Sequence, residues 1–348
     1  MSSPPIRVLI AEDSPVFREL LMSILQTSPD LQVVGMARNG AEAVRLVKRL
    51  EPDVITMDIY MPEMDGFEAT RQIMTETPRP IVVISSGVEK NERDLTFSAL
   101  KAGALAVMPK PTVFDPPEVH RALAHQVKLM AEVKVVRHWS GDRRSTSPLA
   151  KSSTPVLLEH DSGKIRLVAV AASTGGPGVL AEILGGLPAD FPVPILIVQH
   201  ITPGFSQGLA DWLNQQTPLA VSLAQAGQVP QPGQALIAPD HVHLSVDSRS
   251  VVLIKNDDQR RSVCPAADVL FDGVARYFGS KAVGVILTGM GSDGAEGLKA
   301  MRDRGARTIA QDERSCVVFG MPAVAIQLGA AEQVLPAGRI AAAVRALV

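Results

Sequence analysis

Short apolar runs, each ending at a polar residue, alternate with helical stretches over two long parts of the chain. In the first part we expect strands at residues 6–11, 31–37, 54–57, 81–84 and 105–108. Apolar residues recur at helical spacing between them, as they do at Val16, Phe17, Leu20, Leu21, Ile24 and Leu25. Strands that alternate with helices in this way predict βα units and a parallel sheet that is buried on both faces.

The pattern is interrupted once, near the middle of the chain. Residues 137–163 are rich in serine, proline and charged residues, a composition typical of a linker. Further strands are expected at residues 165–172, 193–199, 282–287 and 308–311, with short strands between 233 and 255. We therefore predict two α/β domains, residues 1–131 and 164–348, and a linker at 132–163. The first is a five-stranded parallel (βα)5 domain, and the second is a doubly wound, mostly parallel sheet with a small antiparallel hairpin.

Composition excludes several classes of protein. Of 348 residues, 46% are apolar, so each domain can bury a core, and a net charge of −2 argues against a nucleic-acid binder. The two cysteines, Cys264 and Cys316, are too few for a disulfide framework or a multi-cysteine zinc site. Because no signal sequence and no apolar run of about 18 residues is visible, we expect a cytoplasmic protein without membrane insertion.

Polar residues that follow the strands of the first domain form one expected cluster. Glu12 and Asp13 follow the first strand and Asp58 the third, and neighbouring strand ends of a doubly wound sheet open into one crevice. Three carboxylates repel one another unless a hard cation such as Mg²⁺ binds between them. Ser85 and Lys110 follow the last two strands and add a hydroxyl and a positive charge. The set suits transfer of a phosphoryl group to a carboxylate, although each residue alone also fits an ordinary loop.

In the second domain, Ser173, His200 and Asp293 each follow a separate apolar strand, so they can meet at one sheet edge. A serine hydroxyl becomes a nucleophile when an imidazole held by a carboxylate takes its proton. Ser173 also starts an expected helix, whose unpaired N–H groups could hold an oxyanion. Each residue has a structural alternative: Ser173 as an N-cap, His200 as a hydrogen-bonded strand end and Asp293 as a turn residue.

Other interpretations stay open from the residues alone. His241 and His243 lie two apart beside Asp240 and could bind a metal, but alternation along a strand also explains them. The loop with Gly175 and Gly176 could belong to a non-catalytic nucleotide-binding module, although it lacks the full spacing of the known phosphate-binding fingerprints. A transcription regulator is disfavoured because the second half shows neither a helix-turn-helix pattern nor a basic face.

The first cluster resembles the receiver domain of two-component response regulators over residues 6–130, including the loop MPEMDG at 61–66. The resemblance implies that Asp58 is the phospho-acceptor. It also implies that Asp13, Asp58 and the carbonyl of Tyr60 bind Mg²⁺ directly, while Glu12 acts through water.

Within the same resemblance, Ser85 and Lys110 support the phosphorylation site. Val107 is a departure, because receivers usually carry an aromatic residue there, three positions before the lysine, that changes rotamer on phosphorylation. We therefore expect the switch to act through Ser85 and the loop after the fourth strand.

Five segments of the second domain resemble the CheB family of chemotaxis protein-glutamate methylesterases. They are AASTGG at 171–176, VQH at 198–200, DVLF at 268–271, LTGMGSDG at 287–294 and SCVVFGMP at 315–322. The resemblance covers about residues 165–330, and a receiver in front of the esterase is also the CheB domain order. It implies a triad of Ser173, His200 and Asp293, with the N–H groups of Thr174 and Met290 as oxyanion donors.

The family resemblance further implies hydrolysis of glutamyl methyl esters on chemoreceptor helices and deamidation of glutamine, with no cofactor for the esterase. The implied partners are methyl-accepting chemotaxis receptors as substrate, a CheA-type histidine kinase as phosphodonor and an opposing methyltransferase. The receiver is expected to block the triad until Asp58 is phosphorylated. Ala171 stands where the family often has glycine, and its methyl group could shift the nucleophile turn.

Overall fold

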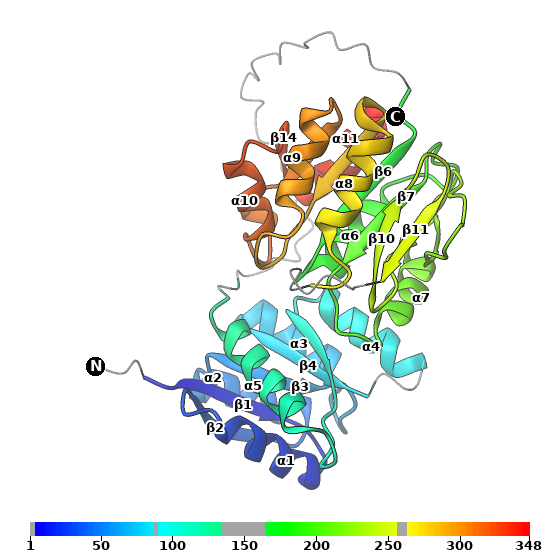
Figure 1. Cartoon of the computed structure of the whole chain (residues 1–348). Helices are drawn as coiled ribbons and strands as arrows, with labels where there is room; N and C mark the ends of the chain where they lie inside the picture. Colours follow the sequence, from blue (N-terminus) through cyan, green and yellow to red (C-terminus); the bar gives the residue numbers. More distant parts are fainter. Residues whose placement is uncertain (1–3, 87–89, 134, 136–163, 256–262) are drawn as a thin grey trace.

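The computed structural model describes residues 4–86, 90–133, 135, 164–255 and 263–348. They form two α/β units, each built on its own sheet, with the first unit drawn in blue and cyan in Figure 1. The predicted fold class is therefore confirmed. The predicted linker at 132–163 lies almost wholly outside the described residues, so its boundaries stay a prediction. Among the described helices, none has the length and apolarity needed to cross a bilayer.

The first sheet has the order β2-β1-β3-β4-β5, and all its strands pair in parallel. Its strands are β1 (Ile6–Ala11), β2 (Leu31–Ala37), β3 (Val54–Asp58), β4 (Ile81–Ser85) and β5 (Ala106–Pro109). Its helices are α1 (Pro15–Gln26), α2 (Gly40–Leu50), α3 (Gly66–Glu76), α4 (Lys90–Lys101) and α5 (Pro117–Ala131). Sequence analysis predicted all five strands to within one residue at each end.

Successive residues of β1 enter opposite faces of this sheet. Val8 and Ile10 pack with α1 and α5, whereas Leu9 packs with α2, α3 and α4. Polar side chains begin two of these helices, since Asn39 accepts the Glu42 N–H at α2 and Asp65 accepts the Glu68 N–H at α3. Both faces of the sheet are covered, which explains why the strands read as continuous apolar runs.

The second sheet has the order β14-β13-β12-β6-β7-β9-β8, and its strands also pair in parallel. Its strands are β6 (Leu167–Ala172), β7 (Ile195–Gln199), β8 (Ala220–Leu223), β9 (Gln234–Ile237), β12 (Ala282–Ile286), β13 (Arg307–Gln311) and β14 (Gln333–Leu335). The predicted antiparallel hairpin is β10 (Val242–Val246) with β11 (Val251–Lys255). Its helices are α6 (Gly176–Gly185), α7 (Ser206–Gln216), α8 (Ala267–Tyr277), α9 (Ala295–Asp303), α10 (Met321–Gln327) and α11 (Ala337–Leu347), with short 3₁₀ turns η1 (Gly279–Lys281) and η2 (Glu313–Ser315).

Strand order reverses at one strand in each sheet. The first strand of the first sheet, β1, lies between β2 and β3, and the first strand of the second sheet, β6, lies between β12 and β7. The connection that follows this strand and the one that follows its neighbour, β3 or β12, leave in opposite directions, so a crevice opens at their carboxyl ends. Both predicted clusters follow strands that meet at these two places.

The two units share one hydrophobic cluster, which runs from the first sheet through α4 to α6 and α7. Figure 1 shows α4 on the side of the first unit that faces the second. Phe97 of α4 stacks on Trp212 of α7, with ring centroids 5.8 Å apart. A Cβ added at Gly178 of α6 would lie 3.3 Å from the Cα of Lys101. We call this contact between α4 and the pair α6 and α7 the seam.

Candidate functional site

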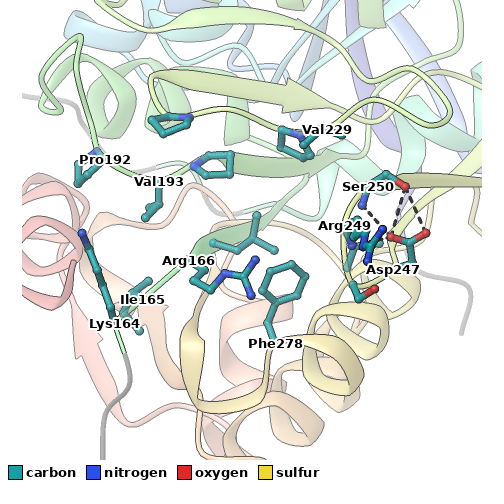
Figure 2. A pocket seen from close by; sticks show the side chains of 16 residues that line it. Lys164, Ile165, Arg166, Pro192, Val193, Val229, Asp247, Arg249, Ser250 and Phe278 are labelled. Carbon is teal, nitrogen blue, oxygen red and sulfur yellow. Dashed lines mark hydrogen bonds between the residues drawn. The ribbon is translucent and has the colours of Figure 1, made fainter.

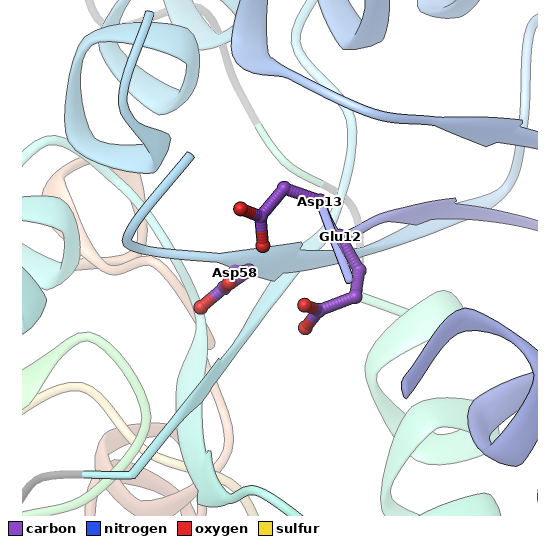
Figure 3. A group of neighbouring side chains, drawn as sticks. All are labelled: Glu12, Asp13 and Asp58. Atoms are coloured by element: carbon purple, nitrogen blue, oxygen red, sulfur yellow. The ribbon is translucent and has the colours of Figure 1, made fainter. Parts of the chain in front are cut away.

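The predicted carboxylates of the first unit do come together. One oxygen each of Glu12, Asp13 and Asp58 lies within 4.8 Å of the others, and Figure 3 shows the three side chains gathered at the ends of β1 and β3. Glu12 and Asp58 are buried, while Asp13 is exposed. The Nζ atom of Lys110 lies 2.8 Å from Asp58 Oδ2 and 3.1 Å from Glu12 Oε2. Lys110 also lies over the ring of Phe17, 5.0 Å from its centroid.

Burial and mutual repulsion set the charges of this cluster. Burial raises the pKa of Glu12 to about 7, and the neighbouring charge of Asp58 adds to the effect. Burial also raises the pKa of Asp58, although Lys110 opposes the shift. Burial alone would lower the pKa of Lys110, but its contacts with Asp58 and Glu12 raise it. A positive charge at this edge would therefore stabilise the ionised carboxylates.

The donor set fits a hard divalent cation. All three side chains offer carboxylate oxygens, which are the ligands that Mg²⁺ prefers. Asp58 Oδ1 is buried and has no hydrogen-bond partner among the described residues. Tyr60 lies two residues after the end of β3, so its carbonyl belongs to the same loop. A cation there would give the buried oxygen a partner.

Ser85 and the loop after β3 complete the first site. Ser85 is buried at the end of β4, and its Oγ accepts a hydrogen bond of 3.1 Å from the hydroxyl of Thr96 in α4. Gly66 starts α3 so close to β3 that an added Cβ would lie 2.0 Å from the carbonyl oxygen of Asp58. Glycine is therefore required at position 66 for the loop to fold back on the strand end.

Val107 lies at the boundary of the two units. Its side chain is buried in β5, and its carbonyl accepts a hydrogen bond of 2.5 Å from the hydroxyl of Thr202. Thr202 follows His200 by two residues. The position where a receiver usually has an aromatic side chain is thus joined through its backbone to the second unit.

His200 and Asp293 form a close pair in the second unit. His200 follows β7, Asp293 lies in the loop after β12, and His200 Nε2 lies 2.8 Å from Asp293 Oδ2. The first N–H groups of α8, from Ala267 and Asp268, donate to the two oxygens of Asp293 at 2.6 and 3.1 Å. Burial alone would raise the pKa of Asp293, but the hydrogen bonds from His200 and α8 hold it below its ordinary value. Asp293 is therefore an anion oriented by a helix N-terminus.

Ser173 lies at the end of β6, beside this pair. Its N–H donates to the carbonyl of Thr288 at 3.0 Å, and its carbonyl accepts from Gly176 N–H and Gln199 Nε2, both at 2.8 Å. Ser173 and His200 line one cavity of about 240 Å³. Among the described residues no hydrogen bond joins the Ser173 hydroxyl to His200, a looseness that is common before substrate binds. Because Asp293 holds Nε2, the ring nitrogen left for the serine is Nδ1.

Backbone N–H groups on both sides of Ser173 remain available for a ligand. Those of Thr174 and Met290 donate to no acceptor among the described residues. The loops that carry them are tied together, since the Thr288 hydroxyl donates to the Thr174 carbonyl at 2.9 Å and accepts from Val318 N–H at 2.9 Å. Fixed donors of this kind are what a developing oxyanion needs.

Several alternatives from the sequence are decided by the structure. The helix expected to start at Ser173 starts instead at Gly176, with Gly175 in the left-handed region at its cap, so Ser173 is not the N-cap. His243 is a buried strand residue whose Nδ1 accepts the Ala266 N–H at 3.0 Å. His241, in contrast, is an exposed turn residue with a φ of +63° just before β10, so the strand alternation that the sequence favoured for both histidines holds only for His243. Among the described residues, the candidate metal ligands that lie together are those of the first unit.

Two other features of the second unit are structural. Burial raises the pKa of the Cys316 thiol to about 12 and also raises the pKa of Cys264, so both are poor nucleophiles at neutral pH. Ala171 is fully buried, and its methyl group lies 3.5 Å from the place of a Cβ on Gly294. The methyl group of Ala171 therefore packs into the core beside a glycine.

Two polar residues at strand ends were not given a role by sequence analysis. Gln199 donates from one nitrogen to the carbonyls of Ser173 and His200, both at 2.8 Å. An added Cβ at Gly176 would lie 2.1 Å from Gln199 Oε1, so the amide fits only against glycine. The Thr288 hydroxyl connects the loops around Ser173 through its hydrogen bonds with Thr174 and Val318. A polar residue that ends an apolar strand is the signal that could have found both.

A larger hollow of about 310 Å³ lies at the other end of the second sheet, where β6 and β7 begin. Figure 2 shows its mixed wall of apolar side chains, such as Val229 and Phe278, and basic ones, such as Arg166 and Arg249. None of the predicted site residues lines it. The larger of the two cavities therefore lies at the end of the sheet opposite to the predicted site residues.

Two family descriptions match the chain, the response regulator receiver domain over residues 8–124 and CheB methylesterase over residues 168–344. The chain belongs to the CheB methylesterase family. It is a methylesterase with a receiver domain, as the sequence predicts. The receiver is the first unit, and the esterase is the second.

Relatives agree with this membership over nearly the whole chain. A protein-glutamate methylesterase/protein-glutamine glutaminase of Syntrophus aciditrophicus is 48% identical over 342 residues, which cover 97% of this chain and 96% of the relative. One of Myxococcus xanthus is 47% identical and covers 96% of this chain and 95% of the relative. The crystal structure of the Thermotoga maritima CheB methylesterase catalytic domain has a TM-score of 0.50 at 40% identity, covering 53% of this chain and 100% of that chain.

Asp268 provides a test of electrostatics next to Asp293. Its Oδ1 accepts the Gly297 N–H at 2.8 Å, and burial, with the charge of Asp293, raises its pKa to about 6. The unfolded chain ionises Asp268 at lower pH, so the free energy of unfolding should fall as pH rises through about 6. Asp268→Asn keeps the acceptor and removes the charge. We expect the variant to gain stability over the native chain between pH 4.5 and 7.5 in urea denaturation, and equal pH dependence would contradict this.

Gln199 should hold the nucleophile and the base in register. Gln199→Glu replaces a donor that serves two carbonyls by a carboxylate that repels them, and we expect turnover at neutral pH to fall about 10- to 100-fold. The loss should shrink as pH falls and the new carboxyl becomes protonated. Gln199→Met, which cannot donate at any pH, is the matched control with a pH-independent loss. Parallel pH profiles of the two variants would contradict this role.

Proposed function

We propose that the protein hydrolyses glutamate methyl esters, and deamidates glutamines, on the cytoplasmic helices of methyl-accepting chemotaxis receptors. The observation that carries the proposal is the His200–Asp293 pair, oriented by the N-terminus of α8, beside a cavity that Ser173 also lines. An imidazole held by a buried carboxylate is the arrangement that activates a serine hydroxyl. The names of the relatives support the coarser part of this proposal, activity on glutamate methyl esters and glutamines of a protein.

In this mechanism Ser173 Oγ attacks the ester carbonyl while His200 Nδ1 takes the hydroxyl proton. The carbonyl oxygen becomes an oxyanion held by the N–H groups of Thr174 and Met290. His200 returns the proton to the methoxy group, methanol leaves, and an acyl-serine remains. Water then attacks with the same base, which releases the glutamate carboxylate and restores Ser173. Asp293 stabilises the imidazolium in both halves.

Glutamine would follow the same route, with ammonia in place of methanol. The poorer leaving group makes protonation by His200 more important in that reaction. The opposing methyltransferase of the pathway would remake the ester that this enzyme removes.

Phosphorylation of the receiver would control the esterase. Asp58 would accept a phosphoryl group from a CheA-type histidine kinase, with Mg²⁺ held by Asp13, Asp58 and the carbonyl of Tyr60, and by Glu12 through water. The cation neutralises charge on the transferring group. Lys110 and the Ser85 hydroxyl would stabilise the added phosphoryl oxygens.

The seam supports a closed state before phosphorylation. The cavity at Ser173 is walled on one side by receiver residues, among them Leu100, Val107 and Met108. A receptor helix about 10 Å wide cannot enter while the receiver lies there. The receiver would therefore exclude the protein substrate by occupying its place.

A short path joins the phosphorylation site to the seam. Ser85 binds the hydroxyl of Thr96, and the next residue, Phe97, stacks on Trp212. If the Ser85 hydroxyl turns to a phosphoryl group, its contact with Thr96 is lost and α4 is free to shift. No swinging aromatic ring at Val107 is needed for this route.

Ser173→Ala should abolish methanol release from methylated receptor membranes, by at least about 1,000-fold, because the variant lacks the hydroxyl that would form the acyl intermediate. Phosphorylation of Asp58 should be unchanged. Ser222→Ala, an exposed serine on β8, serves as the control. Retained turnover in Ser173→Ala would remove this residue from the mechanism.

Phe97→Ala should weaken the seam. A stacked aromatic pair adds about 0.5–1.5 kcal/mol beyond its buried area, so we expect receptor demethylation without phosphodonor to rise up to about tenfold. Phe67→Ala, a similar truncation in α3, is the control for general damage to the receiver. An unchanged or lower basal rate in Phe97→Ala alone would argue against blockade by the receiver.

A further inference from the structure

We infer that the closed form, with the receiver in place, is already an esterase for small neutral carboxylic esters, and that phosphorylation gates the enzyme by substrate size. This inference rests on the proposed role of Ser173. It differs from the proposed function because it assigns a second substrate class and a state in which that class is turned over.

The receiver covers the site but does not fill it. A cavity of about 240 Å³ remains between the units, with Ser173, Thr174 and His200 on one wall and receiver residues such as Val107 and Met108 on the other. Pockets for drug-sized ligands measure about 300–1,000 Å³. The space therefore suits a molecule somewhat smaller than a drug, such as a short-chain ester.

The site is not sealed by the receiver. The receiver contacts α6, where Gly178 meets Lys101. Ser173 and Thr174, which line the cavity, still keep part of their surface exposed, and Met290, outside the cavity lining, is 36% exposed. The side chains of His200 and Asp293 keep 14% and 17% of their surface exposed with the receiver in place. Water and small solutes can thus contact His200 and Asp293 in the closed form.

Most of the groups that the reaction needs are in place without movement of the receiver, and the hydrogen bond from the Ser173 hydroxyl to His200 would form when substrate binds. The His200–Asp293 pair is formed, and the N–H groups of Thr174 and Met290 have no acceptor among the described residues. An ester RCOOR′ would acylate Ser173 with release of R′OH, and water would then release RCOOH and restore the serine. Only the size of R and R′ separates this reaction from that on a receptor helix.

Chemistry of the walls selects the substrate. Apart from Gln126, the receiver side of the cavity is apolar, and apart from His200 none of the side chains that line the cavity is ionisable. A charged acyl group would lose its hydration without gaining a partner. We therefore expect short neutral esters, with p-nitrophenyl acetate as the probe, to react better than anionic ones such as p-nitrophenyl succinate.

The test compares two substrates on the full-length chain, with and without Mg²⁺ and beryllium fluoride as a phosphoryl mimic. The Ser173→Ala background is subtracted in each case. We expect methanol release from receptors to rise at least tenfold with the mimic, while hydrolysis of p-nitrophenyl acetate changes less than twofold. If hydrolysis of the small ester required the mimic, the inference would be overturned and the proposed function would stand. The same holds if small-ester hydrolysis did not depend on Ser173 although receptors were demethylated. Failure of Ser173 to act on either substrate in either state would overturn the proposed function as well.

A second variant tests the cavity itself. Gln126 lies on α5 and lines the receiver side, so Gln126→Trp should reduce small-ester hydrolysis at least fivefold in the closed form only. His125→Trp, on the exposed face of the same helix, is the matched control and should leave the rate unchanged. Equal rates for both variants in the closed form would show that small esters do not reach Ser173 through this cavity, and would overturn the inference.

Discussion

Parallel pairing of the central strands is the constraint on which both sites depend. In each sheet the order reverses at one strand, so the carboxyl ends of that strand and its neighbours open into a crevice. The crevice beside β1 collects Glu12, Asp13 and Asp58, and the crevice beside β6 collects Ser173, His200 and Asp293. Without parallel pairing, the members of each set would lie at opposite edges of a sheet.

Helix termini and strand-end amides turn these crevices into chemically useful sites. Two N–H groups of α8 fix Asp293 as an anion, and Asp293 in turn fixes the orientation of His200. Gln199 joins the backbone of Ser173 to that of His200. Each of these contacts comes from backbone or from a residue outside the triad, which explains why three side chains alone do not describe the site.

One helix of the seam, α4, contacts both the first sheet and the second unit. Thr96 of α4 contacts Ser85 at the end of β4, while Phe97, one residue later, contacts Trp212 of the second unit. Side chains of neighbouring helical residues point in different directions, so a single turn can face both partners. The apolar core continues through this turn from one unit to the other, and a local change at β4 can therefore bias the contact between the units.

Sequence alone determined the alternation of strands and helices, and hence the parallel sheets, because an apolar run buried on both faces needs no knowledge of its neighbours. It also determined which polar residues end each strand, and the motifs that carry the family membership. Edge strands β8 and β14 escaped prediction because they are short and partly exposed, so their pattern is weak. Tertiary structure alone decided that Asp293 contacts Nε2 of His200, that Gln199 bridges two carbonyls, and that the methyl group of Ala171 packs into the core. It also decided that the receiver covers the cavity without filling it. These features depend on distances between segments up to about a hundred residues apart, which spacing along the chain does not encode.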